Sequence, residues 1–449
     1  MTPNALSTDL YELTMMAGYR ANGLTGLASF ELFVRRLPEQ RSFLVAAGLE
    51  QALEYLEGLR FTPEDITFLR SVPNLQAAPR DFFDDYLPAF RFTGEVWAVD
   101  EGTPIFAEEP LLRVTAPLPE AQLVETALLA ILTFQTSIAS KAARLIEVAD
   151  GRLVVEFGAR RAHGLEAALL AARAAYLAGC DGTSFTDAGR RFGIPLSGTM
   201  AHSWVLAFPD EMDAFRKYAA LFGERAVFLL DTYDAVRAAE RIAAEGLRSV
   251  AVRLDSGDVI RLSREVRRTL DAAGMTATRI FVTGDLDEHR IASCLAAGAP
   301  VDGFGVGTSL STSSDAPALG GVYKLVELNR DGVAVAVMKL SPDKLTRPGR
   351  KQVWRRVTDG RATGDVISLH DEPGPAGSQP LLRRVMSKGR RSIEGTSLSD
   401  MRARCREAVH QLPPDVRRLQ SPKPYPIEHS ARLTNLGEEK AHSARGNGR

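Results

Sequence analysis

The sequence predicts an α/β protein: an irregular (β/α) barrel of about seven parallel strands, joined to a discontinuous α+β, sandwich-like domain. Three observations lead to this prediction. Short apolar segments alternate with helical patterns between residues 153 and 307, short β-prone pieces separated by turns occupy much of the first 117 residues, and β-prone character returns after Gly321. Strands that alternate with helices imply a parallel sheet, whereas consecutive strands imply an antiparallel one.

Length, charge and cysteine content limit the possible classes of protein. The 449 residues suffice for two or three packed units. The 55 Lys and Arg residues nearly balance the 56 Asp and Glu residues, so the overall charge favours neither a nucleic acid nor an anionic membrane as partner. Three widely spaced cysteines, Cys180, Cys294 and Cys405, fit a reducing, cytoplasmic location. We expect no signal peptide, and no run reaches the ~20 apolar residues of a membrane helix.

The first 129 residues are expected to form the α+β domain. A helical pattern covers 9–23, and apolar strands cover 28–34 and 91–99. The stretch 92–117 alternates β-prone pieces with Gly and Pro breaks, as in a small antiparallel sheet.

A barrel domain is expected over 130–321. A long helix over 120–143, with helical spacing of apolar residues and no Gly or Pro, leads into it. The candidate strands are 153–158, 183–187, 194–198, 226–231, 249–255, 279–285 and 302–307. A doubly wound open sheet is the alternative. The barrel is favoured because nearly every candidate strand runs into charged, hydroxyl or glycine residues at its carboxyl end, where such barrels carry their chemistry.

The segments after Gly321 are expected to form a hairpin about an Asn-Arg-Asp-Gly turn and to rejoin the N-terminal sheet. About 322–385 would then complete the first domain. Residues 386–430 have a helical and basic pattern, and the polar residues 431–449 are expected to be a disordered tail because they offer little to bury.

Two motifs at strand ends suit anionic ligands. Arg160 and Arg161 follow a buried strand, a position that favours bidentate capture of phosphate or carboxylate oxygens, although such a pair more often forms surface salt bridges. His202 lies between Thr199 and Ser203 in a loop of small residues, whose backbone N–H groups can approach an anion closely. A single histidine is more often structural, and only these neighbours favour a phosphate-handling role.

Three further strand ends carry acidic or glycine-rich motifs. Asp255 and Asp258 follow Arg253 and could bind ribose hydroxyls or hydrated Mg²⁺, while the Asp-Ser-Gly turn that begins at Asp255 could at the same time cap the next helix. Gly284 and Asp285 repeat the pattern one strand later. The last strand end is glycine-rich, as in the phosphate-binding loops of barrel enzymes. It contains Gly305, Gly307 and Thr308. These residues predict a phosphorylated ligand with a ribose, and they leave aldolases, isomerases and phosphoribosyltransferases open.

Seven motifs, in this order along the chain, resemble those of the nicotinate phosphoribosyltransferase family. They are STDLYELTM from Ser7, FELFVR from Phe30, EFGARR from Glu156, GTMAHS from Gly198, VRLDSGD from Val252, GVGTS from Gly305 and VYKLV from Val322, followed by the segment 339–355. The resemblance covers about residues 5–385, and the ordered set is far more specific than any one motif.

The resemblance implies that nicotinate and phosphoribosyl pyrophosphate give nicotinate mononucleotide and pyrophosphate, the first step of NAD salvage from nicotinate. ATP would be a co-substrate, hydrolysed through a phosphohistidine at His202, and Mg²⁺ a cofactor. Arg253 and Asp255 would be the other catalytic residues.

By the same resemblance, Tyr11, Thr199 and Arg253 would contact nicotinate, and Thr308 with its adjacent glycines the phosphoribosyl group. Arginine suits the first role because it favours a carboxylate over an uncharged amide. The resemblance also implies a homodimer in which the N-terminal domain of one subunit completes the partner's site.

Several alternatives remain open at this stage. His163 is a second strand-end histidine, so the choice of His202 depends on the motif match. No counterpart exists to the cysteine cluster that some relatives use for zinc, so no structural metal is expected. The competing functions are a transferase acting on nicotinamide or on quinolinate and, in a different class, a non-catalytic barrel that binds nucleotides.

Overall fold

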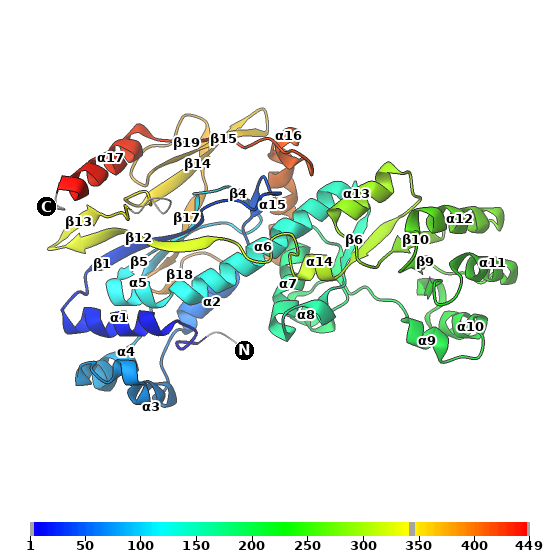
Figure 1. The fold of residues 1–449 in the computed structure, drawn as a ribbon, viewed down its shortest axis with the longest axis horizontal. Coiled ribbons are helices and arrows are strands. Elements are labelled where there is room, and N and C mark those ends of the chain that lie inside the picture. Colours follow the sequence, from blue (N-terminus) through cyan, green and yellow to red (C-terminus); the bar gives the residue numbers. More distant parts are fainter. Residues whose placement is uncertain (1–3, 341–345, 447–449) are drawn as a thin grey trace. The chain divides into compact units, whose positions relative to one another are not determined.

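A computed structural model describes residues 4–340 and 346–446 of the chain (Figure 1). They form two compact units: Met1–Ser137 with Ala318–Arg449, and Ile138–Pro317. Part of the segment 339–355 and the last three residues of the expected tail lie outside the described residues. No helix among the described residues is long and apolar enough to cross a membrane.

The first unit is built on a seven-stranded sheet in the order β13-β12-β1-β5-β3-β17-β18, with antiparallel neighbours (Figure 1). Its strands are β1 (Leu27–Val34), β3 (Glu95–Val99), β5 (Pro110–Pro117), β12 (Gly321–Arg330), β13 (Val333–Ala336), β17 (Leu382–Ser387) and β18 (Arg390–Arg391). The predicted hairpin is confirmed. β12 pairs with β13 across a turn in which Asp331 and Gly332 have positive φ, and with β1, where Phe33 lies opposite Val322.

The remaining strands of this unit form two smaller sheets. A four-stranded sheet contains β16 (Ser378–Pro380), β14 (Lys351–Thr358), β15 (Arg361–Leu369) and β19 (Ile427–His429), and β2 (Leu44–Val45) pairs with β4 (Pro104–Ile105). The N-terminal segment of this unit contains the α-helices α1 (Leu10–Ala21), α2 (Leu49–Gly58), α3 (Pro63–Ser71), α4 (Leu87–Ala89) and α5 (Leu118–Leu123). In the core, the Phe30 and Tyr323 rings stack 4.8 Å apart, and the Tyr323 hydroxyl donates to the carbonyl of Ala121. The hairpin is therefore fastened to the first segment of the chain by packing as well as by strand pairing.

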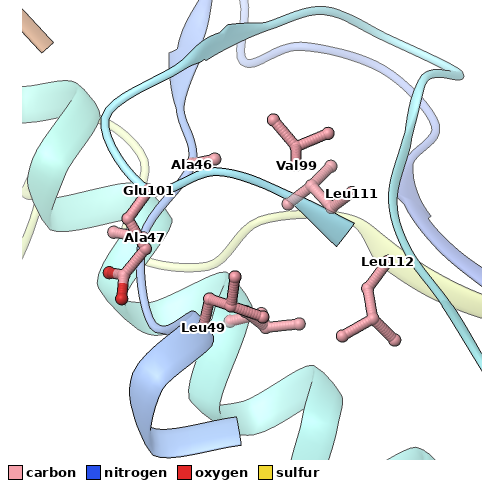
Figure 2. Close-up of a pocket in the computed structure, with 8 residues that line it drawn as sticks. Ala46, Ala47, Leu49, Val99, Glu101, Leu111 and Leu112 are labelled. Atoms are coloured by element: carbon pink, nitrogen blue, oxygen red, sulfur yellow. The ribbon is translucent and has the colours of Figure 1, made fainter. Parts of the chain in front are cut away.

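A cavity in this unit is too small for a substrate. Figure 2 shows it among apolar side chains and the carboxylate of Glu101. Glu101 is engaged at the start of α2, where it accepts from the N–H groups of Gly48 at 2.7 Å and Glu50 at 3.0 Å. The cavity volume of about 10 Å³ corresponds to one water molecule at most.

The C-terminal region differs from the expectation. Residues 386–430 contain α15 (Leu398–Gln411) and α16 (Pro414–Arg417), but also β18 and β19. The prediction of a disordered tail is wrong for 431–446, which form α17 (Ala431–Gly446). The Ser430 hydroxyl caps this helix by accepting from the N–H of Leu433, and Leu433 is fully buried in the core of the unit. A buried leucine, a helix cap and the ion pair between Arg432 and Asp371 therefore help to order a segment whose composition is polar.

The second unit contains a curled, half-barrel sheet of six parallel strands in the order β7-β6-β11-β10-β9-β8. They are β6 (Leu153–Glu156), β7 (Gly182–Thr183), β8 (Val227–Leu229), β9 (Ala251–Leu254), β10 (Arg279–Val282) and β11 (Gly303–Val306). The α/β class and the parallel strands are confirmed. The seventh candidate strand, 194–198, is reduced to one parallel bridge between Thr183 and Leu196, since Pro195 has no N–H to offer a continued ladder.

Helices follow the strands of this unit and cover the sheet. They are α6 (Glu125–Ala149), which begins in the first unit, α7 (Leu165–Leu177), α8 (Thr186–Phe192), α9 (His202–Leu206), α10 (Glu211–Phe222), α11 (Ala235–Glu245), α12 (Val259–Ala272), α13 (Glu288–Ala296) and α14 (Thr308–Ser311). Phe228, Val252 and Ile280 on adjacent strands are fully buried, as both faces of a covered parallel sheet require.

Candidate active site

The carboxyl ends of the parallel strands bring most of the predicted site residues to one edge of the sheet. Glu156 ends β6, Asp231 follows β8, Asp255 follows β9 and Thr283 follows β10. Because adjacent parallel strands end at the same edge, the loops that follow them are neighbours. Hydrogen bonds between these loops define the arrangement of the site.

His202 is the first residue of α9, and its side chain is 40% exposed. Its Nε2 atom lies 3.5 Å from Oδ1 of Asp231, whose side chain is only 6% exposed. The other carboxylate oxygen of Asp231 accepts from the N–H of Asp255 at 3.0 Å and from the Ser256 hydroxyl at 2.6 Å. One buried carboxylate therefore faces the imidazole on one side and fixes the turn after β9 on the other.

Asp231 was missed by the sequence analysis, although it ends the candidate strand 226–231. The signal was available, because this strand also runs into a charged residue at its carboxyl end. Asp231 and His202 lie 29 positions apart in the chain, so their pairing is visible only in the folded structure.

Arg253 links β9 to the loop before α9. Its Nη2 donates to the carbonyl of Met200 at 3.0 Å, and the Thr199 hydroxyl donates to the same carbonyl at 3.0 Å. Burial lowers the pKa of the Arg253 guanidinium, Asp255 and Asp231 oppose this effect, and Arg160 adds to it. A half-buried cation is therefore held beside Thr199, while Ser203 is exposed on the first turn of α9.

The loops after β9 and β10 touch backbone to backbone. The Thr283 hydroxyl donates to Oδ1 of Asp255. Gly284 has φ +87°, and a Cβ atom there would lie 1.9 Å from the carbonyl oxygen of Asp255, so only glycine fits. Asp285 also has positive φ and is exposed. Asp258 takes the capping role, because its Oδ1 accepts from the N–H of Arg261 in the first turn of α12.

The glycine-rich end of β11 packs against the end of β6. A Cβ atom at Gly305 would lie 2.6 Å from the Phe157 ring, and one at Gly158 would lie 1.5 Å from the Ser311 hydroxyl. Close approach of these backbones brings Gly307 and the exposed Thr308, the first residue of α14, to the same edge.

Glu156 is a buried carboxylate beneath this edge. It accepts from the N–H of Gly158 at 2.5 Å, the Thr183 hydroxyl at 2.6 Å and the Ser311 hydroxyl at 3.1 Å. Burial raises the pKa of Glu156, and these three hydrogen bonds counteract the rise. Glu156 therefore ties the ends of β6 and β7 to α14.

The other predicted residues have exposed side chains, and Arg160 lies near enough to Arg253 to lower the pKa of its guanidinium. Arg160 and Arg161 are exposed in the short 3₁₀ helix η3 (Ala159–Arg161), followed by the exposed His163. Tyr11 belongs to α1 of the first unit, whereas the other predicted site residues belong to the second. Its hydroxyl pKa is raised by burial and by the acidic residues around it, chiefly Glu125.

The arrangement suits anionic substrates better than a resident metal. It combines a half-buried arginine, two exposed arginines, glycine-lined loops and an imidazole beside a carboxylate. No cluster of three His, Cys, Asp or Glu residues in the described parts of the chain could hold a metal ion. A divalent cation here would need substrate phosphates as additional ligands, which is the usual mode for Mg²⁺.

Family models match most of the chain. The nicotinate phosphoribosyltransferase N-terminal domain matches residues 6–133, the nicotinate phosphoribosyltransferase family 153–360, and the nicotinate phosphoribosyltransferase C-terminal domain 375–437. The second match includes every predicted site residue except Tyr11, which lies in the first.

Similar proteins match over nearly their whole length. The nicotinate phosphoribosyltransferase pncB2 of Mycobacterium tuberculosis is 45% identical over 437 residues, covering 96% of this chain and 92% of its own. The nicotinate phosphoribosyltransferase of Bacillus subtilis is 40% identical, covering 98% and 96%. The crystal structure of human nicotinic acid phosphoribosyltransferase has a TM-score of 0.83 at 31% identity, covering 96% and 99%. A nicotinate-nucleotide pyrophosphorylase from Pyrococcus furiosus has a TM-score of 0.75 at 26% identity, covering 91% and 95%.

Proposed function

The chain belongs to the nicotinate phosphoribosyltransferase family, and we propose that it joins nicotinate to phosphoribosyl pyrophosphate at the strand ends of its half-barrel. It is an enzyme of this family, which uses ATP as a co-substrate. The observation that supports this location best is the group formed by His202, Asp231 and Arg253 at one sheet edge.

In the transfer step, the ring nitrogen of nicotinate forms a bond to the anomeric carbon of the ribose. The bond from that carbon to pyrophosphate breaks, and the leaving oxygen takes the electron pair. Both substrates are anions that repel each other, so the protein must hold them in position. Arg253 binds the nicotinate carboxylate with Thr199, and the half-burial of its charge strengthens that attraction.

The phosphoribosyl group lies along the loops after β10 and β11. Their backbone N–H groups and the Thr308 hydroxyl bind its phosphates, with Gly284, Asp285, Gly305 and Gly307 allowing close approach. Ser203, Asp258, Arg160 and Arg161 complete the set of substrate contacts, with the two exposed guanidinium groups suited to phosphate oxygens.

His202 accepts the γ-phosphoryl group of ATP. The bond between the γ-phosphorus and its bridging oxygen breaks, ADP leaves with the electron pair, and a nitrogen–phosphorus bond forms. Because Nε2 faces Asp231, Nδ1 is the nitrogen with the free electron pair, and Asp231 stabilises the positive charge that the imidazole gains. Water later attacks the phosphorus, releasing phosphate and free His202.

Mg²⁺ is the cofactor that this chemistry calls for. Asp255 has one oxygen engaged by Thr283, and the second offers a hard ligand of the kind that Mg²⁺ takes together with phosphates. Bound there, the ion would neutralise charge on the pyrophosphate.

The second unit is the transferase domain, and the first unit serves a partner subunit. The exposed Tyr11 of one chain completes the site of the other in a homodimer. The three cysteines are buried and no disulfide links them, which suits a cytoplasmic location.

The decisive experiment measures nicotinate mononucleotide made from nicotinate, phosphoribosyl pyrophosphate and Mg²⁺, with and without ATP. We expect strong stimulation by ATP in the parent and none in His202→Ala. His163→Ala, altered at the other strand-end histidine, serves as the matched control and should keep the stimulation. Turnover of nicotinamide or quinolinate in place of nicotinate would contradict the proposed substrate, and stimulation that survives in His202→Ala would contradict the phosphohistidine.

A further inference from the structure

A group of buried charges lies in the second unit, outside the substrate contacts. Lys141 of α6 places its Nζ 2.5 Å from Oε2 of Glu288 and 3.0 Å from Oδ1 of Asp315, and Nε of Arg144 lies 3.0 Å from Oε1 of Glu288. The side chains of Lys141 and Glu288 are 2% and 0% exposed, and that of Asp315 is 13% exposed. Three segments far apart in the sequence therefore meet at one ammonium group.

These charges are costly to bury, so their presence calls for a reason. Removing an ion pair from water costs several kcal/mol per ion, and a packed apolar pair often gives equal or greater stability. Burial tends to raise the pKa of Glu288, but Lys141 and then Arg144 hold it below its ordinary value. Apolar packing would stabilise these segments equally well. We therefore attribute to the ion pairs a different effect: they link the segments and hold them at a defined distance and orientation.

One end of the link continues into the loop after β10. Glu288 is the first residue of α13 and follows Asp285 by three positions. Between them, Asp287 caps the helix by accepting from the N–H of Arg290. Fixing Glu288 therefore fixes the start of α13, which the tight turn at Gly284 and Asp285 directly precedes in the chain.

The other end continues into the loop after β11. Asp315 lies in a compact turn that folds back on α14: the N–H of Ser314 donates to the carbonyl of Ser309, and the Ser313 hydroxyl donates to the carbonyl of Ala316. The same short helix is held from its other side by the bond from Ser311 to Glu156. A helix of four residues has few bonds of its own, so these anchors set the position of Thr308.

We propose that Lys141 is a positioning residue, whose ammonium group holds the loops after β10 and β11 at the spacing that binds phosphoribosyl pyrophosphate. This role rests on the proposed function of those loops. Lys141 is buried and touches no substrate, so it acts through Glu288 and Asp315. Its loss is expected to weaken binding of the phosphorylated substrate selectively and to leave nicotinate, held by Arg253, much less affected.

The test compares Lys141→Met and Asp315→Asn with Lys351→Met in the first unit. Lys351 forms a similar buried pair with Glu31, at 2.7 Å and with 4% and 0% exposure, so its variant measures the cost of losing such a pair away from the loops. We expect KM for phosphoribosyl pyrophosphate to rise about tenfold or more in both second-unit variants, equivalent to ~1.4 kcal/mol of binding. KM for nicotinate should stay within about twofold, and Lys351→Met should lower the melting temperature without changing the ratio of the two KM values.

A double variant separates positioning from folding. Lys141→Met with Asp315→Asn removes the ammonium group together with one of its carboxylates, and Glu288 keeps Arg144 as its partner, so stability should recover towards the parent while KM for phosphoribosyl pyrophosphate stays raised. Equal changes in both KM values, or a normal KM in Asp315→Asn and in the double variant, would overturn the proposal. Every variant is compared with the parent protein in the same assay for nicotinate mononucleotide. If the proposed function is wrong, the parent itself will form no product, and this outcome is distinct from a failure of the positioning role.

Discussion

At the residue scale, the main feature is the pair formed by His202 and Asp231, in which the carboxylate limits how the imidazole can be oriented. The imidazole is accessible, and its partner carboxylate is almost completely buried and bonded to the turn at Asp255 and Ser256. The carboxylate therefore cannot turn away from the imidazole. Under the proposed function, this geometry would orient His202 for reaction, a role that oriented carboxylates commonly have beside histidines.

Replacing Asp231 with Asn tests this orientation. The amide cannot balance the positive charge on a phosphorylated imidazole, so we expect stimulation by ATP to fall about 10- to 100-fold, while the rate without ATP changes little. The measurement is nicotinate mononucleotide formed with and without ATP. Asp234→Asn is the control, because Asp234 caps α11 and Asn caps equally well. A variant that ATP stimulates as strongly as the parent would remove Asp231 from the mechanism.

Glu12 gives a second prediction at this scale, on stability. Its buried carboxylate accepts from the N–H of Thr126 at 3.1 Å and from the Thr126 hydroxyl at 2.7 Å, yet burial raises its pKa from 4.5 to about 7. The folded state therefore keeps a proton that the unfolded chain has already lost. The free energy of unfolding should fall as pH rises from 4.5 to about 7 and then level off, by an amount on the order of 2–3 kcal/mol.

Urea unfolding of the parent and of Glu12→Gln, at about pH 5 and about pH 8, measures this effect. Glutamine does not titrate, so the variant should lack that part of the pH dependence. Glu54→Gln, altered at an exposed position on α2, should keep it. A parent and a Glu12→Gln variant with the same pH dependence would contradict the assignment.

At the scale of elements, the loops after the parallel strands are held by contacts that side chains would disrupt. Gly284 approaches the carbonyl of Asp255, Gly305 approaches the Phe157 ring, and Gly158 approaches Ser311. The strands themselves are two to four residues long. The shape of the site therefore depends on these close approaches and on the carboxylates of Glu156 and Asp231 beneath them.

Gly284→Ala should damage the site more than it damages the fold. The new methyl group would force the loop after β10 away from Asp255, and we expect kcat/KM for phosphoribosyl pyrophosphate to fall about 100-fold, or ~2.7 kcal/mol. Gly274→Ala is the matched control: its φ of +75° carries a similar strain of about 1–2 kcal/mol, but nothing lies within 4 Å of the new Cβ atom. Equal losses of activity in the two variants would show that strain, and not the close approach, is responsible.

At the scale of the whole molecule, the chain makes one compact unit from two separated segments and places the half-barrel between them in the sequence. The hairpin of β12 and β13 closes the first unit by pairing with β1. Tyr11 belongs to this unit, whereas His202 and Arg253 belong to the other. The proposed homodimer gives a reason for this division, because symmetric pairing lets each chain serve its partner.

Mixing two variants that are each deficient in the presence of ATP tests the shared site. Tyr11→Ala and His202→Ala homodimers should each be deficient, but a heterodimer has one site with both residues intact. After mild unfolding and refolding of an equal mixture, we expect about a quarter of the parent activity with ATP, since half of the dimers are mixed and each has one intact site. Co-refolding Arg253→Ala with His202→Ala is the control and should give no recovery, because both residues belong to one unit. No recovery with Tyr11→Ala would place Tyr11 in its own chain's site or outside any site.

The sequence by itself determined the α/β class, the parallel strands and the returning hairpin, because periodicity and turn chemistry are local properties of the chain. It also indicated which strand ends carry chemistry. Glycine and charged residues after an apolar strand are visible without a fold, and the structure gathers several of them, among them Arg253, Asp255 and Gly284, at one edge of the sheet.

Only the tertiary structure decided which distant residues meet. The pairing of Asp231 with His202, the burial of Lys141 between Glu288 and Asp315, and the order of α17 through Leu433 all join segments far apart in the chain. Local composition even argued against the order of α17, since its residues are mostly polar and its contacts are with distant segments, such as that of Arg432 with Asp371. Burial and ion pairing depend on what other segments place nearby, so no local pattern encodes them.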